Sequence, residues 1–238
     1  MQALSYTPFE KLSVARPVDR IRHIASRCAD KVVLDLGAMD ETAFAAKRGR
    51  GTWLHEEIAR GAARVQGIDS SPAVPESGTV TAPNARIDRV AFDALDDFLA
   101  ANALRPEVVV AGELIEHLDN ALGFFATLRS IAPLRGATLL VSTPNATAIH
   151  NTLVGLVGRE STHVDHLAIH SYKTLNTLLR RSGFDDWTIT PYRSHFVELL
   201  ARTRGATHAG VRFGQSVINA AEYCFPLLSF GYVVQTRL

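Results

Sequence analysis

The sequence predicts a single doubly wound α/β domain with a mostly parallel sheet, and three observations lead to this fold class. Short apolar runs alternate with longer amphipathic runs along the chain, which is the pattern of βαβ units. Two runs, EVVVA at 107–111 and LLVS at 139–142, are apolar throughout, which is typical of strands covered by helices on both faces. The 238 residues are enough for one core of this kind.

Five apolar runs are the strand candidates of this Rossmann-like sheet: Lys31–Leu36, Ala63–Ile68, Arg86–Phe92, Glu107–Ala111 and Ala137–Ser142. Five amphipathic runs are the helix candidates: Asp19–Cys28, Thr52–Gly61, Ala94–Ala103, Asn120–Ile131 and Thr174–Ser182. Gly183 then acts as a helix stop signal. The chain continues with Trp187–Tyr192, an apolar helix candidate and a last strand candidate, Gly231–Thr236. We therefore expect the sheet to end in an antiparallel pair.

The organisation predicted from these elements is one domain over residues 1–238, with no internal repeat. Residues 1–30 form a helical cap in this prediction. Residues 145–171 lack a strong period and carry four histidines, so we expect a functional substrate loop there. The apolar helix candidate at 215–228 suits core packing best, with a lid or a dimer face as alternatives.

Composition and charge exclude several classes of partner. The 25 Lys and Arg residues nearly balance the 24 Asp and Glu residues, giving a net charge of +1, so nothing favours nucleic acid or an anionic membrane. The two cysteines, Cys28 and Cys224, match neither a zinc spacing nor a disulfide framework. No secretory signal or spanning run is visible. We expect a cytoplasmic protein that acts on a small molecule or a glycan, with a homodimer as its candidate assembly.

Polar residues follow the ends of the first three predicted strands, where ligands bind in open α/β sheets. Asp35 ends the first strand, and Gly37 then lets the backbone approach a ligand. Asp69 follows the second strand, where a carboxylate can accept from both hydroxyls of a ribose. Asp93 and Ala94 follow the third strand, where they can meet the edge of an adenine. Each signal also fits an ordinary turn or helix cap, but together they indicate a nucleoside.

Two motifs follow at the ends of the next two strands. The run Gly112-Glu113-Leu114-Ile115-Glu116-His117-Leu118 follows the fourth strand, and Thr143-Pro144-Asn145 follows the fifth. With these motifs the sequence resembles class I S-adenosylmethionine-dependent methyltransferases, in particular the branch with G-E-x-x-E-H-L and T-P-N, over about residues 31–184.

The resemblance implies a seven-stranded sheet and a donor site for S-adenosylmethionine. Asp35 and Gly37 would then hold the methionine end, Asp69 the ribose, and Asp93 with Ala94 the adenine. Gly112 and Glu113 would lie beside the methyl group. The sequence departs from the family in its first loop, where Met39 stands in place of a second glycine.

A cluster of metal-binding residue types follows the fourth strand. If Glu113 opens a helix, then Glu113, Glu116 and His117 share one face of it, and His166 can join them from the loop after the fifth strand. This mixed set of oxygen and nitrogen ligands suits Mg²⁺, Mn²⁺ or Zn²⁺. The pattern is similar to metal-dependent small-RNA 2′-O-methyltransferases and to ubiquinone-pathway O-methyltransferases. Metal-free relatives share the motif, so His166 or His117 as a metal-free general base is the alternative.

The resulting functional hypothesis is methyl transfer from S-adenosylmethionine to a hydroxyl of a small molecule or glycan, with Mg²⁺ or Mn²⁺ as a candidate cofactor. Two alternatives remain at this point. A non-catalytic binding module would explain the depleted glycine loop at Gly37–Glu41. A nicotinamide-dependent oxidoreductase would use the same sheet, although G-x-G-x-x-G is missing after the first strand.

Overall fold

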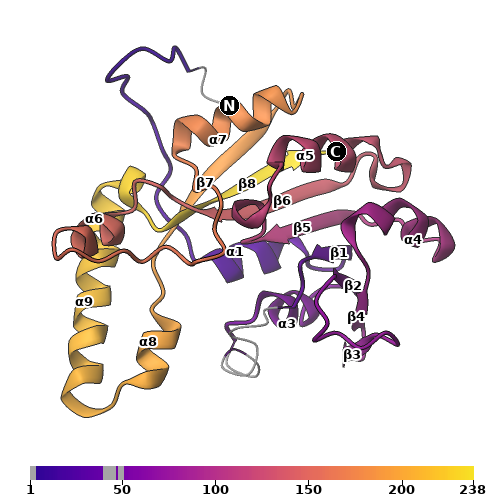
Figure 1. Ribbon diagram of the computed structural model, residues 1–238, viewed down its shortest axis with the longest axis horizontal. Helices are drawn as coiled ribbons and strands as arrows, with labels where there is room; N and C mark the ends of the chain where they lie inside the picture. The colour runs from indigo at the N-terminus through magenta and orange to yellow at the C-terminus, as the bar shows by residue number, and fades with distance from the viewer. Residues whose placement is uncertain (1–3, 40–46, 48–50) are drawn as a thin grey trace.

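The computed structural model describes residues 4–39, 47 and 51–238. Its centre is a twisted sheet with helices on both faces (Figure 1). Within the described chain the sheet has eight strands in the order β3-β4-β2-β1-β5-β6-β8-β7. The strands are β1 Val32–Leu36, β2 Arg64–Asp69, β3 Thr79–Ala82, β4 Ala85–Arg89, β5 Val108–Gly112, β6 Thr138–Pro144, β7 Trp187–Tyr192 and β8 Gly231–Arg237.

The predicted doubly wound α/β class is confirmed. Strands β4, β2, β1, β5 and β6 pair in parallel, whereas β8 runs antiparallel between β6 and β7. The expected antiparallel end of the sheet is therefore present. The sequence prediction missed one strand, β3, which pairs antiparallel with β4 at the edge of the sheet. Its sequence, TVTA, is short and exposed at its start, so it carries little of the apolar signal that marks a buried strand.

The helices lie in two layers. On one face, α4 Leu95–Ala101, α5 Ala121–Ser130 and α7 Tyr172–Arg181 cover the larger core, and on the other α1 Arg20–Arg27 and α3 Leu54–Ala59 cover the smaller one (Figure 1). Alternate side chains of β1 enter the two cores: Leu34 and Leu36 enter the first and Val33 the second. Helices on both faces explain why the central strands are apolar throughout.

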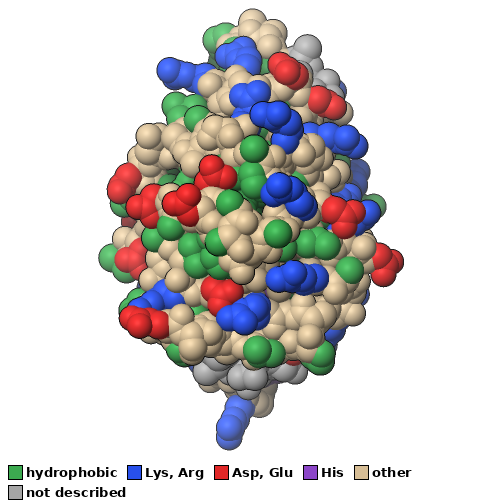
Figure 2. Space-filling view, turned by 90° about the vertical axis from the view of Figure 1, so that its right-hand side faces the viewer, with side chains coloured by type: hydrophobic (Ala, Val, Ile, Leu, Met, Phe, Trp, Pro, Cys, Tyr) green, Lys and Arg blue, Asp and Glu red, His purple; other side chains and the backbone are tan. Residues whose placement is uncertain are grey.

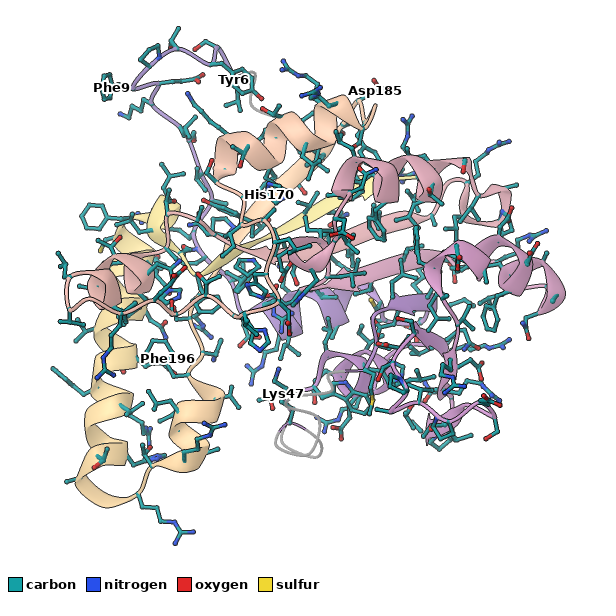
Figure 3. All side chains as sticks on the ribbon, viewed as in Figure 1. Tyr6, Phe9, Lys47, His170, Asp185 and Phe196 are labelled. Carbon is teal, nitrogen blue, oxygen red and sulfur yellow. The ribbon has the colours of Figure 1, made fainter. Side chains whose placement is uncertain are left out.

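The first 30 residues are less helical than expected. Among those described, helix covers only α1, and the preceding segment runs past α7, where Figure 3 shows Tyr6 and Phe9. Lys173 on α7 forms an ion pair with Glu10 at 2.9 Å and donates to the Thr7 carbonyl oxygen at 3.1 Å. This extended segment therefore covers α7 through side-chain contacts rather than as a helical cap.

The region predicted as a substrate loop, 145–171, contains one helix, α6 Ile149–Gly155, and otherwise irregular chain. The Thr-Pro-Asn motif has a structural role at its start. The side-chain amide of Asn145 donates to the carbonyl oxygens of Leu227 and Ser229 at 2.9 and 2.8 Å. The motif thus ties the end of β6 to the beginning of β8.

The helix expected at 215–228 differs most from its prediction. Helix α9 spans Gly205–Cys224, and Pro226 begins a separate 3-10 turn, Pro226–Leu228. Together with α8, Val197–Arg202, it extends away from the sheet (Figure 1). Glu222 is the one buried residue recorded for α9, while Phe213 and Val217 are exposed. The core-packing interpretation of this segment is therefore wrong. Among the described helices, none is long and apolar enough to cross a membrane.

The larger core gives a direct test of this packing. Phe125 on α5 is fully buried and contacts Phe124 and Phe184 edge-on. We expect Phe125→Ala to lower the free energy of unfolding by about 3–5 kcal/mol, because a cavity replaces the ring. The matched control is Leu122→Ala on the same helix, whose side chain is exposed, and it should change this free energy by less than about 1 kcal/mol. Equal losses in chemical denaturation would contradict the packing described here.

Candidate functional site

A cavity of about 960 Å³ lies at the carboxyl ends of β1, β2 and β5. The parallel register places these ends together, since Leu36 pairs with Ile68 on one side and with Ala111 on the other. Five of the predicted donor-site residues line this cavity: Asp35, Gly37, Asp69, Gly112 and Glu113. These five residues come from the ends of three separate strands and line one continuous cavity.

The first loop is held against β2 by its backbone. Gly37 has a φ of 67° and donates its N–H to the Ile68 carbonyl oxygen at 3.0 Å. Met39 donates its N–H to the Asp69 carboxylate at 2.8 Å, and Ser71 donates to the same carboxylate at 2.9 Å. Asp69 thus shapes the loop that surrounds the cavity. Asp40 and Glu41, the rest of the depleted glycine loop, lie outside the described residues.

The two residues predicted to bind adenine do not line the cavity, unlike the other predicted donor-site residues. Asp93 and Ala94 belong to a 3-10 turn, Phe92–Ala94, and neither is among the residues that line the cavity. Val90 and Phe92 line it instead, and the Phe92 ring lies 4.8 Å from that of Phe124. This end of the cavity is therefore apolar, which suits the faces of a flat aromatic base.

The helix expected to begin at Glu113 is absent, so that part of the prediction is wrong. Glu113 has a φ of 53°, and only a 3-10 turn, Ile115–His117, follows it. Asn120 then caps α5 by accepting from the N–H of Gly123 at 2.9 Å. The positive φ of Glu113 is incompatible with a right-handed helix that begins at this residue. The carboxylates of Glu113 and Glu116 consequently do not share a helix face.

Glu113 is engaged by two side chains that the sequence did not indicate. The Tyr192 hydroxyl lies 3.0 and 2.9 Å from the two Glu113 carboxylate oxygens and donates to them, and the Arg20 guanidinium lies 3.7 Å from the nearer one. Burial, together with the Glu113 charge, raises the pKa of Tyr192 well above its ordinary value, so its hydroxyl keeps the proton it donates. Both partners come from distant parts of the chain, which explains why sequence patterns missed them.

Glu116, His117 and His166 come together although no helix joins the first two. One ligand atom from each lies within 4.8 Å of the others. Glu116 is fully buried, and neither of its carboxylate oxygens has a hydrogen-bond partner among the described residues. Burial and the Glu113 carboxylate raise the pKa of Glu116.

The two histidines of this cluster are less buried than Glu116. The His117 ring lies 4.7 Å from that of His166, and its Nδ1 lies 3.2 Å from the Asp165 carbonyl oxygen. Burial lowers the pKa of His166, and the neighbouring His117 and His163 rings add to this effect. His117 and His163 line the cavity, whereas His166 is not among the lining residues and its ring lies 5.7 Å from that of His163. His170, another histidine of the predicted loop, is labelled in Figure 3 and is not among the lining residues.

Comparisons with known proteins agree with this architecture. A model of a methyltransferase domain family matches residues 13–189, more than half of the chain. The chain belongs to this methyltransferase family. A comparison with curated proteins found no match.

Three solved structures are similar to this methyltransferase. A SAM-dependent methyltransferase from Archaeoglobus fulgidus is 16% identical, with a TM-score of 0.49 over 92% of this chain and 94% of that one. The cyclopropane synthase MmaA2 from Mycobacterium tuberculosis is 14% identical, with a TM-score of 0.50 over 91% and 81%. A Haloferax volcanii methyltransferase in complex with the Trm112 activator is 14% identical, with a TM-score of 0.50 over 92% and 88%. At these identities the likeness to the last two structures, each with a TM-score of 0.50, shows the fold alone.

The family model identifies the chain as a methyltransferase. The methyltransferase hypothesis is confirmed at this level, and the nicotinamide-dependent oxidoreductase alternative is wrong. The finding also favours an enzyme over a non-catalytic module. The narrower branch with G-E-x-x-E-H-L and T-P-N stays a prediction.

The contact between Tyr192 and Glu113 is testable without a substrate. We expect Tyr192→Phe to lower the free energy of unfolding by about 1–3 kcal/mol, because a half-buried carboxylate loses its hydroxyl donor. Tyr223→Phe is the matched control, since that ring is exposed, and it should leave stability within about 0.5 kcal/mol. A Tyr192→Phe protein as stable as the wild type would rule out this contact as a stabilising one.

Proposed function

We propose that this methyltransferase transfers the methyl group of S-adenosylmethionine to a hydroxyl oxygen of a small molecule or glycan. The observation that carries the proposal is the pair of imidazoles, His117 and His163, on the wall of the cavity that also contains the candidate donor residues. A neutral imidazole can accept the proton of a hydroxyl at ordinary pH, which attack by an alcohol oxygen requires.

The donor is expected to span the three strand ends. Asp35 and Gly37 would hold its methionine end, and Asp69 its ribose. Val90 and Phe92 supply the apolar surface for adenine, and Asp93 and Ala94 can contribute only from beyond the lining residues. Gly112 and Glu113 then lie where the sulfonium methyl points. The reaction needs few reactive groups, because the sulfonium is already a good leaving group and alignment supplies most of the rate.

His117 is the base that the geometry favours, although the sequence pointed first to His166. His117 lines the cavity, while His166 packs against it with ring centroids 4.7 Å apart. In the proposed step the acceptor oxygen attacks the methyl carbon, the carbon–sulfur bond breaks, and the hydroxyl proton passes to the imidazole. S-adenosylhomocysteine and a methyl ether are the products. The proton then leaves the imidazole to solvent.

The size of the cavity and the charge of the whole chain favour a small acceptor. A volume of about 960 Å³ is at the upper end of ordinary small-molecule sites, which leaves room for an acceptor beside the donor. Both acidic and basic side chains occur on the face in Figure 2, and the net charge is +1. The electrostatic attraction that nucleic-acid binding requires is not apparent here. The cytoplasmic location and the homodimer stay predictions.

We expect His117→Ala to lower the turnover number by at least about a hundredfold, with S-adenosylhomocysteine affinity unchanged. The experiment supplies donor with a ¹³C-labelled methyl group to a panel of hydroxylated small molecules and oligosaccharides. NMR then distinguishes a methoxy carbon from an N-methyl carbon. His208→Gln on α9 is the control and should retain full turnover. Products carrying only N-methyl groups would contradict the proposal.

A metal-assisted version of the same reaction is the second candidate, and the unpartnered buried atoms favour it. Both Glu116 carboxylate oxygens and Nδ1 of His166 lack hydrogen-bond partners among the described residues, and His117 completes a three-ligand group. Two imidazoles and one carboxylate suit Mn²⁺ better than Mg²⁺, which prefers an all-oxygen shell. A bound ion would hold the acceptor oxygen and lower the pKa of its hydroxyl.

Calorimetric titration of the chelator-treated protein with Mn²⁺ separates this candidate from the metal-free base. If the metal binds, Glu116→Gln should weaken binding at least about tenfold, the scale of one lost ligand. Glu107→Gln is the control and should retain affinity, because that carboxylate pairs with Lys31 at the other end of β5. The absence of Mn²⁺ binding would exclude the metal-assisted version for this ion and leave His117 as the base.

A further inference from the structure

A short segment at the start of α3, Trp53-Leu54-His55, contacts the first loop, the first strand and the fifth strand. We propose that this segment is a clamp that holds the loop around the donor, and that His55 is a positioning residue for Asp35. The inference rests on the proposed donor site, in which Asp35 receives the methionine end of S-adenosylmethionine. It adds the residues that fix that carboxylate in place.

The pair formed by His55 and Asp35 is the centre of the clamp. Nδ1 of His55 lies 2.8 Å from Oδ2 of Asp35, and the two residues are 1% and 4% exposed. An ionised carboxylate can only accept, so Nδ1 carries the hydrogen and donates it. A buried, charge-assisted hydrogen bond of this kind is among the stronger ones in proteins. It holds one oxygen of Asp35 while the residue still lines the cavity.

The other side of the imidazole is held by the strand that the sequence did not predict. Nε2 of His55 lies 2.9 Å from the Thr81 hydroxyl oxygen, and Thr81 belongs to β3. The ring is therefore fixed at both nitrogens, between the first strand and the edge of the sheet. This contact gives the additional strand a role in the site, because it completes the series Asp35–His55–Thr81.

Gly67 in β2 makes room for the ring. It pairs with Asp35 in the sheet register, and a Cβ added to it would lie 3.0 Å from Cε1 of His55 and 2.9 Å from the Ala38 side chain. Any larger residue at this position would push the imidazole or the first loop out of place. The lack of a side chain at Gly67 therefore leaves the space that the His55 ring of the clamp occupies.

The two preceding residues hold the neighbouring backbone. The indole N–H of Trp53 donates to the Ala38 carbonyl oxygen at 3.1 Å, and the Trp53 ring lies 5.1 Å from that of His55. Leu54 packs over Gly112, where an added Cβ would come within 2.6 Å of its side chain. The first loop has Met39 at the position expected for a second glycine. The hydrogen bond from the Trp53 side chain therefore holds a first loop that lacks the second glycine.

Two ligands that differ only at the methionine end test the inference. S-adenosylhomocysteine carries the amino acid group that Asp35 would bind, whereas 5′-methylthioadenosine lacks it. We expect His55→Leu to weaken S-adenosylhomocysteine binding at least about tenfold and to change 5′-methylthioadenosine binding by less than about twofold. His55→Asn should restore most of the affinity, because its amide can still donate to Asp35. Both ligands are titrated calorimetrically into each variant.

Two further variants keep the test decisive. Thr81→Val leaves the His55–Asp35 hydrogen bond intact and should weaken S-adenosylhomocysteine binding only about twofold to threefold. This variant replaces His55→Leu in the test if the His55→Leu protein does not fold. Equal losses for both ligands, or an unchanged S-adenosylhomocysteine affinity in both His55→Leu and Thr81→Val, would overturn the positioning role. Asp35→Asn distinguishes a failure of the His55 positioning role from a failure of the proposed donor site. If it leaves S-adenosylhomocysteine binding unchanged, the proposed donor site itself is wrong.

Discussion

The parallel pairing of β1 with β2 and β5 is the constraint on which the rest of the structure depends. It brings Leu36, Ile68 and Ala111 into register, so the chain leaves three strands at the same edge of the sheet. The loops that follow must then share one space, and that space is the cavity. Helices on both faces keep water from the strands, which leaves their carboxyl ends as the place where polar side chains can meet a ligand.

The fold could be predicted because its main signals are local. Runs such as Val108–Gly112 are apolar throughout since both faces of the sheet are covered, and that property is visible without any tertiary information. The position of Asp35, Gly37 and Asp69 on the cavity wall was also predictable, because the end of each strand marks it. In each case a short stretch of sequence contains the whole signal.

The rest could not be predicted because it depends on distant contacts. Glu113 has a left-handed backbone and is held by Tyr192, a residue 79 positions away, so its expected helix had no local reason to fail. The exposure of α9 could likewise not be predicted, because it depends on how α8 and the sheet are arranged around that helix. The histidine cluster is a mixed case: Glu116, His117 and His166 are adjacent as predicted, but through a 3-10 turn rather than a helix face.

The proposed donor site is one cavity at the ends of β1, β2 and β5, with His117 among its lining residues. A crystal structure of the protein with S-adenosylhomocysteine tests it most directly. We expect the homocysteine amino group beside Asp35, the ribose hydroxyls beside Asp69, the adenine against Phe92 and the sulfur facing the space in front of Gly112 and His117. Density for the ligand outside this cavity, or with the adenine at Asp35 and the amino acid group at Phe92, would contradict it.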